Sequence, residues 1–192
     1  MNRIYTSLCL LFLLTSYQGN AQDNYQGSFR GKKPYGTHIQ FDENGQAALT
    51  VQYSGRGIIE SVRIGGDSIQ REFRFTQPFD SIEWKLIKKG LWINKEADDE
   101  VFVQKFPKKA IVHCHYAGYL LNGQSFDNSF VRTLPLQGKL GRFVTGFSLG
   151  IWNIPPGEVR VIKIAPKLAY KNRRIGIIPP HATLIYFIYR ID

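Results

Sequence analysis

Short stretches in which apolar and polar residues alternate, separated by turn residues, dominate this chain from residue 35 onward. Within residues 35–79, four such stretches are separated by turn sequences at 42–45, 54–57 and 65–67. Because alternation with a period of two places one face of a segment in a core, we expect four short strands joined by hairpin turns. This β-rich module is too small to bury much apolar surface alone, so we expect it to pack on the rest of the chain or to self-associate with another copy.

The remainder of the chain, residues 80–192, has further strand-like segments and one segment with helical spacing. Apolar residues recur on one helical face between residues 143 and 154, with Thr145 as a candidate N-cap and the sequence Pro-Pro-Gly directly afterwards. β-branched and aromatic residues dominate the segments 159–164 and 183–191. One short helix among several strands with hairpin-length connections predicts an α+β fold, in which an antiparallel sheet wraps around the helix.

The first 21 residues differ from the rest and have the pattern of a cleavable signal peptide. Arg3 gives a positive start, and the apolar run at 8–14 is much shorter than the ~20 residues of a membrane span. The small residues Gly19 and Ala21 match the positions that a signal peptidase reads. We therefore expect cleavage after Ala21 and a periplasmic or secreted location. The polar, glycine-rich segment 22–34 is expected to be a flexible lead-in.

The formal net charge of +10 changes this picture little. Lys and Arg residues are scattered in short pairs, without the long basic arm or the motif of a nucleic-acid-binding protein. A solvated basic surface is the simpler interpretation, and a functional basic patch is the alternative. We expect no nucleic-acid partner and, because no other apolar stretch is long enough, no membrane span.

Beyond the signal peptide the chain has one cysteine, Cys114, which cannot form an intramolecular disulfide. Cys114 lies in a strand-like run, so it shares a face with Tyr116, whereas His113 and His115 share the opposite face. If Tyr116 points into the core, both histidines are exposed. Two histidines at this spacing bind a metal weakly, and no further Cys or His cluster completes a site, so neither a metal nor a cofactor is expected.

Several short motifs then occur in one order and with matching spacing. They are His-Tyr-Ala-Gly at 115–118, Gly123 with Phe-Asp-Asn-Ser at 126–129, Leu-Gly-Arg-Phe-Val-Thr-Gly-Phe at 140–147, Gly-Glu at 157–158, and Ala-Tyr at 169–170 with Ile-Ile-Pro-Pro-His-Ala-Thr-Leu at 177–184. Each motif alone is weak, but together they make residues 81–192 resemble the FKBP-type peptidyl-prolyl cis-trans isomerases, a macrolide-binding family. The resemblance covers the whole of that domain.

The resemblance implies an isomerase of Xaa-Pro peptide bonds whose partners are proline-containing polypeptides and macrolide inhibitors. The positions that match the family's catalytic residues are Tyr116, Phe126, Asp127, Phe147 and Tyr170. The positions that match its substrate-binding residues are Arg132, Leu136, Phe143, Val144, Ile177, Ile178 and Tyr186. The resemblance implies no cofactor.

Elementary chemistry is consistent with this assignment. Rotation about a peptide bond has a barrier of ~18–20 kcal/mol, and the twisted transition state loses amide resonance and charge separation. The polar planar amide is therefore disfavoured in a dry aromatic pocket, for which the candidates are Phe126, Val144, Phe147, Ile178 and Tyr186. We expect Asp127 to stay ionised beside Arg132 and to hold Tyr116 or the twisted carbonyl, and Tyr170 to fix the chain next to the proline. No nucleophile, metal or proton relay is required.

The chain departs from the family pattern at four positions, which are Phe147 for tryptophan, Phe143 for valine, Lys171 for glycine and Leu136 for phenylalanine. Two alternatives to an active isomerase therefore stay open. One is a proline-peptide binding or chaperone module with little turnover, and the other is an assembly protein led by residues 35–79. Taken one at a time, the aromatic residues also fit an ordinary core, and Asp127 fits a turn.

Overall fold

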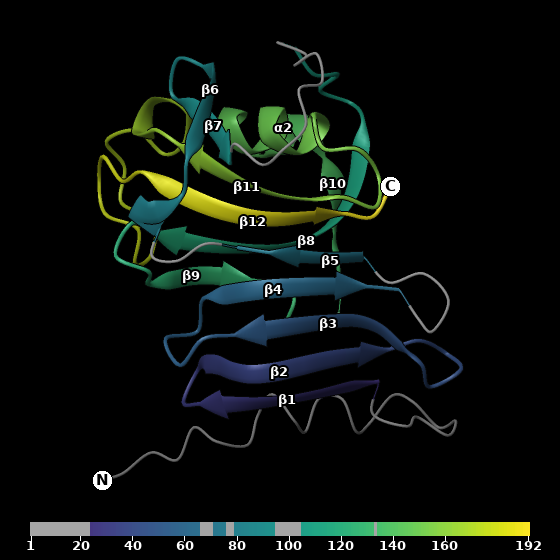
Figure 1. The fold of residues 1–192 in the computed structure, drawn as a ribbon. Helices are drawn as coiled ribbons and strands as arrows, with labels where there is room; N and C mark the ends of the chain where they lie inside the picture. Colours follow the sequence, from purple (N-terminus) through teal and green to yellow (C-terminus); the bar gives the residue numbers. More distant parts are fainter. Residues whose placement is uncertain (1–23, 66–70, 76–78, 95–104, 133) are drawn as a thin grey trace, which may run out of the picture.

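The computed structural model describes residues 24–65, 71–75, 79–94, 105–132 and 134–192, which form two antiparallel sheets and a short helix (Figure 1). The signal peptide predicted for residues 1–21 lies outside these residues. Within them, no helix combines the length and the apolar character that crossing a bilayer requires. The predicted α+β fold, with an antiparallel sheet around one short helix, is confirmed.

The N-terminal sheet is a meander of five strands that follow one another in chain order. They are β1 (Tyr25–Arg30), β2 (Lys33–Phe41), β3 (Ala47–Tyr53), β4 (Ile59–Ile64) and β5 (Arg71–Arg74).

The sequence predicts four strands here, and the additional strand is β1, which corrects the expectation of a flexible lead-in at 22–34. Side-chain contacts with β2 explain the difference. The Tyr25 hydroxyl hydrogen-bonds to Nδ1 of His38, and the Phe29 ring lies edge-on to the His38 ring at 5.1 Å. Gly31, with a φ of 61°, makes the tight turn into β2. Polar residues thus form a strand because their neighbour across the sheet supplies the partners.

The C-terminal sheet has the strand order β10-β8-β12-β11-β7-β6, with β9 paired to β8 beside this path. Its strands are β6 (Trp84–Lys88), β7 (Leu91–Asn94), β8 (Ile111–Leu120), β9 (Ser125–Asn128), β10 (Leu136–Lys139), β11 (Val159–Ile164) and β12 (Leu184–Arg190). Short 3-10 turns lie at η1 (Phe79–Ser81), η2 (Leu140–Arg142) and η3 (Pro166–Leu168). The last strand in the chain, β12, therefore lies inside the sheet between β8 and β11.

The helix α2 (Thr145–Trp152) is buried on almost every side rather than on one face, since six of its 8 residues are buried. It packs closely on β11, because a Cβ added at Gly146 or Gly150 would lie under 3.0 Å from the side chain of Ile164 or Ile162. The predicted Thr145 cap is wrong. Val144 is the N-cap residue and makes no side-chain capping bond, and Thr145 is the first helical residue.

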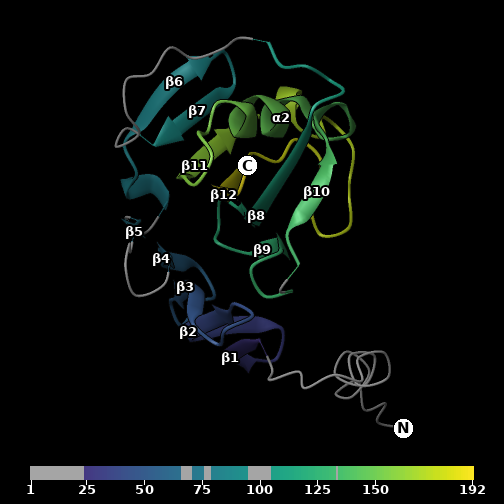
Figure 2. The same ribbon diagram turned by 90° about the vertical axis from the view of Figure 1, so that its right-hand side faces the viewer.

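The two sheets share one hydrophobic core, which lies on the face of the C-terminal sheet opposite α2 (Figures 1 and 2). The N-terminal sheet and the loop after β3 contribute Leu49, Val51, Tyr53, Ile58, Ile59 and Val62. The C-terminal part contributes Phe79, Ile82, Ala117, Tyr119, Phe130, Val159, Val161, Ile185 and Phe187. The apolar face of the module at 35–79, expected to meet either the rest of the chain or another copy, is thus occupied within the chain.

This shared core corrects the prediction that His113 and His115 are both exposed. His115 is 4% exposed, because its ring stacks at 5.3 Å on Phe130, a member of the core that the two sheets share. His113 is half-buried, with Nδ1 at 2.6 Å from Oδ2 of Asp192. Cys114 is buried on the α2 side, as predicted.

Replacing Gly146 by alanine is expected to lower the free energy of unfolding by about 1–3 kcal/mol, because the added methyl group overpacks against Ile164. Helix propensity alone predicts the opposite, a gain of about 1 kcal/mol for alanine over glycine. Urea unfolding measures the change. Gly55→Ala is the control, since no atom lies within 4 Å of a Cβ added there. A G146A protein as stable as the wild type would contradict the close contact.

Candidate functional site

Five aromatic side chains gather where α2 meets the C-terminal sheet. We call them the aromatic cluster: Tyr116, Phe126, Phe143, Phe147 and Tyr186. Phe147 makes edge-to-face contacts with three of the others, at centroid distances of 5.0 Å to Tyr186, 5.3 Å to Phe143 and 5.7 Å to Tyr116. Phe126 joins from β9, 5.5 Å from Tyr186. The buried members come from β8, α2 and β12, and Phe126 and Phe143 are half-buried at the edge.

The pairing of β8 with its two neighbours explains how Phe126 and Tyr186 meet. Gly118 in β8 lies opposite Tyr186 of β12 and opposite Asp127 of β9. A Cβ at position 118 would lie under 3.0 Å from the Phe126 ring and at 3.0 Å from the Tyr186 ring. The glycine of the motif at 115–118 therefore provides the space in which the two rings contact each other.

The other predicted substrate-binding residues differ in their placement. Leu136 and Val144 are half-buried against the core that contains the aromatic cluster, and Ile178 is 4% exposed within it. Tyr170, a predicted catalytic residue, packs against the same core. Ile177 is 49% exposed and lies outside that core, beside the short bridge between residues 175 and 178.

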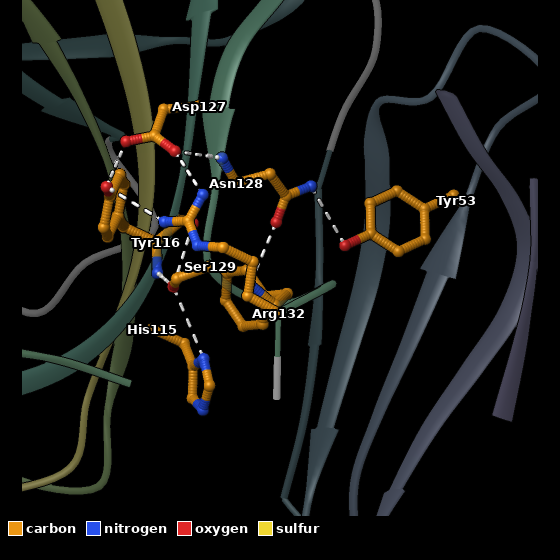
Figure 3. A network of polar contacts seen from close by, with 8 residues as sticks. Tyr53, His115, Tyr116, Asp127, Asn128, Ser129 and Arg132 are labelled. Atoms are coloured by element: carbon orange, nitrogen blue, oxygen red, sulfur yellow. Dashed lines mark hydrogen bonds and ion pairs between the residues drawn. The ribbon is translucent and has the colours of Figure 1, made fainter. Parts of the chain in front are cut away.

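A polar triad of Tyr116, Asp127 and Arg132 lies at the edge of the aromatic cluster (Figure 3). The Tyr116 hydroxyl donates to Oδ2 of Asp127, and Nη1 of Arg132 lies 2.5 Å from Oδ1. Nη2 of Arg132 also donates to the Tyr116 hydroxyl oxygen at 3.3 Å, which closes the triad. The Asp127 and Arg132 side chains are 39% and 51% exposed, so solvent screens their attraction and a ligand can reach both.

Two members of the triad hold their protons firmly. Burial, together with the hydrogen bond to Asp127, raises the pKa of Tyr116 well above its ordinary value, so the hydroxyl remains a donor. Burial alone would lower the pKa of Arg132, but the hydrogen bond and charge of Asp127 outweigh it and the net shift is upward. Burial, and the neighbouring Tyr170, likewise raise the pKa of Tyr186. These three groups keep their protons throughout the physiological range.

Behind the triad lies a second layer of polar contacts, which sequence reasoning missed. The Asn128 N–H donates to Oδ1 of Asp127 at 2.9 Å, and the Ser129 hydroxyl accepts from the Tyr116 N–H at 2.7 Å. The Asn128 side chain donates to the hydroxyl of Tyr53, in β3, at 3.2 Å. The motif at 126–129 contains the first two of these residues and could have indicated them. Nothing near Tyr53 in the sequence marks it as part of this site.

Lys171, which stands where the family has glycine, lies in a turn with a left-handed backbone conformation. Lys171 has a φ of 58°, the left-handed conformation that glycine adopts without strain. Its N–H donates to the carbonyl of Pro166 at 2.9 Å, and its own carbonyl accepts from the His181 N–H at 2.7 Å. Two backbone hydrogen bonds thus hold Lys171 in the left-handed conformation, which costs a residue with a Cβ atom roughly 1–2 kcal/mol of free energy.

The chemistry that this arrangement offers is non-covalent. Burial raises the pKa of the Cys114 thiol to about 12, which leaves it unsuited to act as a nucleophile. Among the residues that the structure describes, no three His, Cys, Asp or Glu side chains converge on a point where a metal ion could bind. What remains is the largely buried aromatic cluster, bordered by one carboxylate, one guanidinium and the tyrosine hydroxyls.

Comparisons with known proteins agree with this geometry. The family model described as FKBP-type peptidyl-prolyl cis-trans isomerase matches residues 103–189. FK506-binding protein 2 of Yarrowia lipolytica is 40% identical over 107 residues, which are 54% of this chain and 74% of that protein. The FKBP-type peptidyl-prolyl cis-trans isomerase FkpA of Escherichia coli K12 is 36% identical over 78 residues, 41% of this chain and 29% of that protein.

The solved N-terminal domain of FKBP42 from Arabidopsis thaliana superposes with a TM-score of 0.50 at 19% identity. The superposition covers 61% of this chain and 96% of that chain, and it shows a common fold. The match to the family model falls in the C-terminal part of the chain, where the aromatic cluster and the polar triad lie.

The buried His115 makes stability depend on pH. Burial lowers its pKa from 6.5 to about 4, so between these values the unfolded chain binds more protons than the folded one. The contribution of neutral His115 is therefore complete above about pH 6.5 and is lost as the pH falls through about 4. We expect roughly 3 kcal/mol of stability to be lost in this window.

His115→Gln should flatten the pH dependence, which urea unfolding at intervals between pH 4 and 7 measures. His181→Gln is the matched control, because His181 is exposed. Burial also lowers the pKa of His38, so part of the slope will persist in the His115 variant. An unchanged slope in H115Q would contradict the assignment.

Proposed function

We propose that this chain, which belongs to the FKBP-type peptidyl-prolyl cis-trans isomerase family, accelerates rotation about Xaa-Pro bonds in exported polypeptides as they fold. The observation that carries the proposal is the aromatic cluster with the polar triad at its edge. Both are built from residues at positions where the resemblance implies catalytic or substrate-binding residues. The catalytic and substrate-binding roles given below are parts of the same proposal.

Catalysis in this proposal is differential solvation of the amide. A planar Xaa-Pro amide is polar because of resonance, and the twisted transition state is less polar. Transfer from water to the surface of Phe126, Phe147 and Tyr186 destabilises the planar form more than the twisted form. The uncatalysed reaction takes ~10–100 s, so even a modest reduction of the barrier matters on the time scale of folding.

The polar triad would orient the substrate rather than react with it. Asp127, held by Arg132, accepts the Tyr116 hydrogen bond and keeps that hydroxyl in a fixed position at the wall of the aromatic cluster. A fixed donor or carboxylate beside the proline limits the number of substrate orientations, which is the entropic part of catalysis. Tyr170 would bind a substrate carbonyl, and Ile177 and Ile178 would cover the proline ring.

Two further statements belong to the proposal. Macrolides would bind the same aromatic surface and compete with proline peptides, in line with the name FK506-binding protein 2 of the Yarrowia relative. The signal peptide pattern at residues 1–21 supports a periplasmic or secreted location, where folding polypeptides would be the clients.

A second candidate function is proline-peptide binding with little turnover, and the observation in its favour is Phe147. The family's floor residue at this position is tryptophan, and phenylalanine is smaller and lacks the indole N–H. Phe143, larger than the family's valine, lies 5.3 Å from Phe147 and fills part of the same space. We infer that the two departures compensate in volume, whereas a phenylalanine ring at position 147 has no N–H to donate.

The two functions are separated by a protease-coupled assay on Xaa-Pro peptides. We expect the wild type to accelerate isomerisation and Asp127→Ala to lower kcat/KM roughly ten- to hundredfold, since hydrogen bonds to a charged group contribute about 1.5–3 kcal/mol. Glu43→Ala, in the exposed turn after β2, is the control and should leave kcat/KM unchanged. No acceleration by the wild type, together with measurable peptide binding, would leave only the binding module.

Volume compensation between Phe143 and Phe147 gives a further prediction. Phe147→Trp alone should lower the free energy of unfolding by about 1–3 kcal/mol, because the larger ring overpacks against Phe143. Adding Phe143→Val should restore most of that stability. The double variant should also have a higher kcat/KM than the wild type if the missing indole limits the rate. Strictly additive effects of the two substitutions in urea unfolding would contradict the compensation.

A further inference from the structure

The short segment 127–132 has one side in the candidate site and the other in the core shared by the two sheets. Asp127 and Arg132, at its ends, form the ion pair of the polar triad. Between them, Asn128 is 8% exposed and Phe130 is 1% exposed. A displacement of the buried residues Asn128 and Phe130 would therefore also move Asp127 and Arg132 at the two ends of the segment.

Asn128 connects the site to the N-terminal sheet, because its backbone N–H contacts Asp127 and its side-chain amide contacts Tyr53 (Figure 3). Its backbone N–H donates to Oδ1 of Asp127 at 2.9 Å, and its side-chain Oδ1 accepts from the Phe130 N–H at 3.0 Å. Its Nδ2 donates to the hydroxyl of Tyr53 at 3.2 Å. Because the side-chain amide is planar, the Tyr53 hydroxyl fixes which way the amide faces, and so fixes the turn that presents Asp127.

A second contact anchors the same segment from another strand of the N-terminal sheet. Nε2 of Gln40, in β2, donates to the carbonyl oxygen of Phe130 at 2.7 Å. The two tethers join residues 75 and 90 positions apart in the sequence. Tyr53 is 2% exposed, so water cannot readily replace its hydrogen bond to Asn128.

We propose that Tyr53 and Gln40 of the N-terminal sheet are positioning residues for proline isomerisation, acting through Asn128 and Phe130 on the Asp127–Arg132 pair. The N-terminal sheet would then contribute to catalysis by positioning Asp127, in addition to covering the C-terminal sheet. The proposal rests on the proposed isomerase function for its kinetic consequence, but its geometric consequence at Asp127 is independent of activity.

The chain provides a matched pair of variants that separates positioning from stability. Tyr53→Phe removes the hydroxyl that binds Asn128. Tyr119→Phe removes another buried hydroxyl that also joins the two sheets, by donating to the Gly57 carbonyl at 3.2 Å, but that belongs to neither the triad nor the 127–132 segment. Y53F removes one hydrogen bond between the N-terminal and C-terminal parts, and Y119F removes two, to the Gly57 carbonyl and from the Ile59 N–H, so both should lower the urea midpoint.

The experiment measures kcat and KM on an Xaa-Pro peptide, and the 13C signal of the Asp127 carboxyl group by NMR. Y53F is expected to lower kcat/KM about three- to tenfold, chiefly through kcat, because a misplaced group loses orientation. It should also shift the Asp127 signal. Y119F should change neither readout. Gln40→Leu, which removes the second tether, should act in the same direction as Y53F.

Two outcomes would overturn the proposal. One is Y53F matching Y119F in both readouts, and the other is a change in only one of the two readouts when the wild type is active. If the wild type has no isomerase activity, the proposed function fails, and the Asp127 signal alone still decides whether Tyr53 positions the carboxylate.

Discussion

The packing of the N-terminal sheet against the C-terminal sheet is the contact on which the rest of the structure depends. A single antiparallel sheet around one helix leaves its outer face to solvent, and here that face carries Tyr119, Ile185 and Phe187, which are fully buried. The N-terminal sheet supplies the cover, and it in turn has no other partner for its own apolar face among the described residues. Each sheet therefore buries the apolar face of the other, whereas two domains with separate cores would not depend on each other in this way.

The proposed function makes two opposing demands on the candidate site. Amide twisting is favoured by an apolar surface, whereas orienting the substrate requires charged groups that such a surface would desolvate. The structure separates them in space: Phe147 and Tyr186 are buried, and Asp127 and Arg132 stay partly exposed at the edge. Tyr116 joins the two regions, because its ring belongs to the aromatic cluster and its hydroxyl to the polar triad. In the proposed mechanism, desolvation would thus affect the substrate amide more than the ion pair that holds Tyr116.

What the sequence could reveal depended on whether the information was local. Tyr116, Phe126 and Asp127 lie in contiguous motifs, and the structure brings them together as neighbours on paired strands. The strand β1 was not predicted, because it is stabilised by contacts with His38 on the next strand rather than by an alternating pattern of its own. The burial of His115 could not be read from alternation, which tells which residues share a face but not what covers that face. The contact of Tyr53 with Asn128 joins positions 75 residues apart, and no pattern in either segment encodes it.

The position of β12 has a consequence for how the molecule assembles. This strand is the last in the chain, yet it lies between β8 and β11 and contributes Ile185 and Phe187 to the core beneath the N-terminal sheet. As the chain emerges in order from the N-terminus, the first sheet can form its hairpins early, but the surface on which it rests is incomplete until residues 184–190 arrive. Its apolar face can therefore be covered only after residues 184–190 have been made. We expect the packing of the two sheets to be a slow step, because it depends on contacts between residues far apart in the sequence.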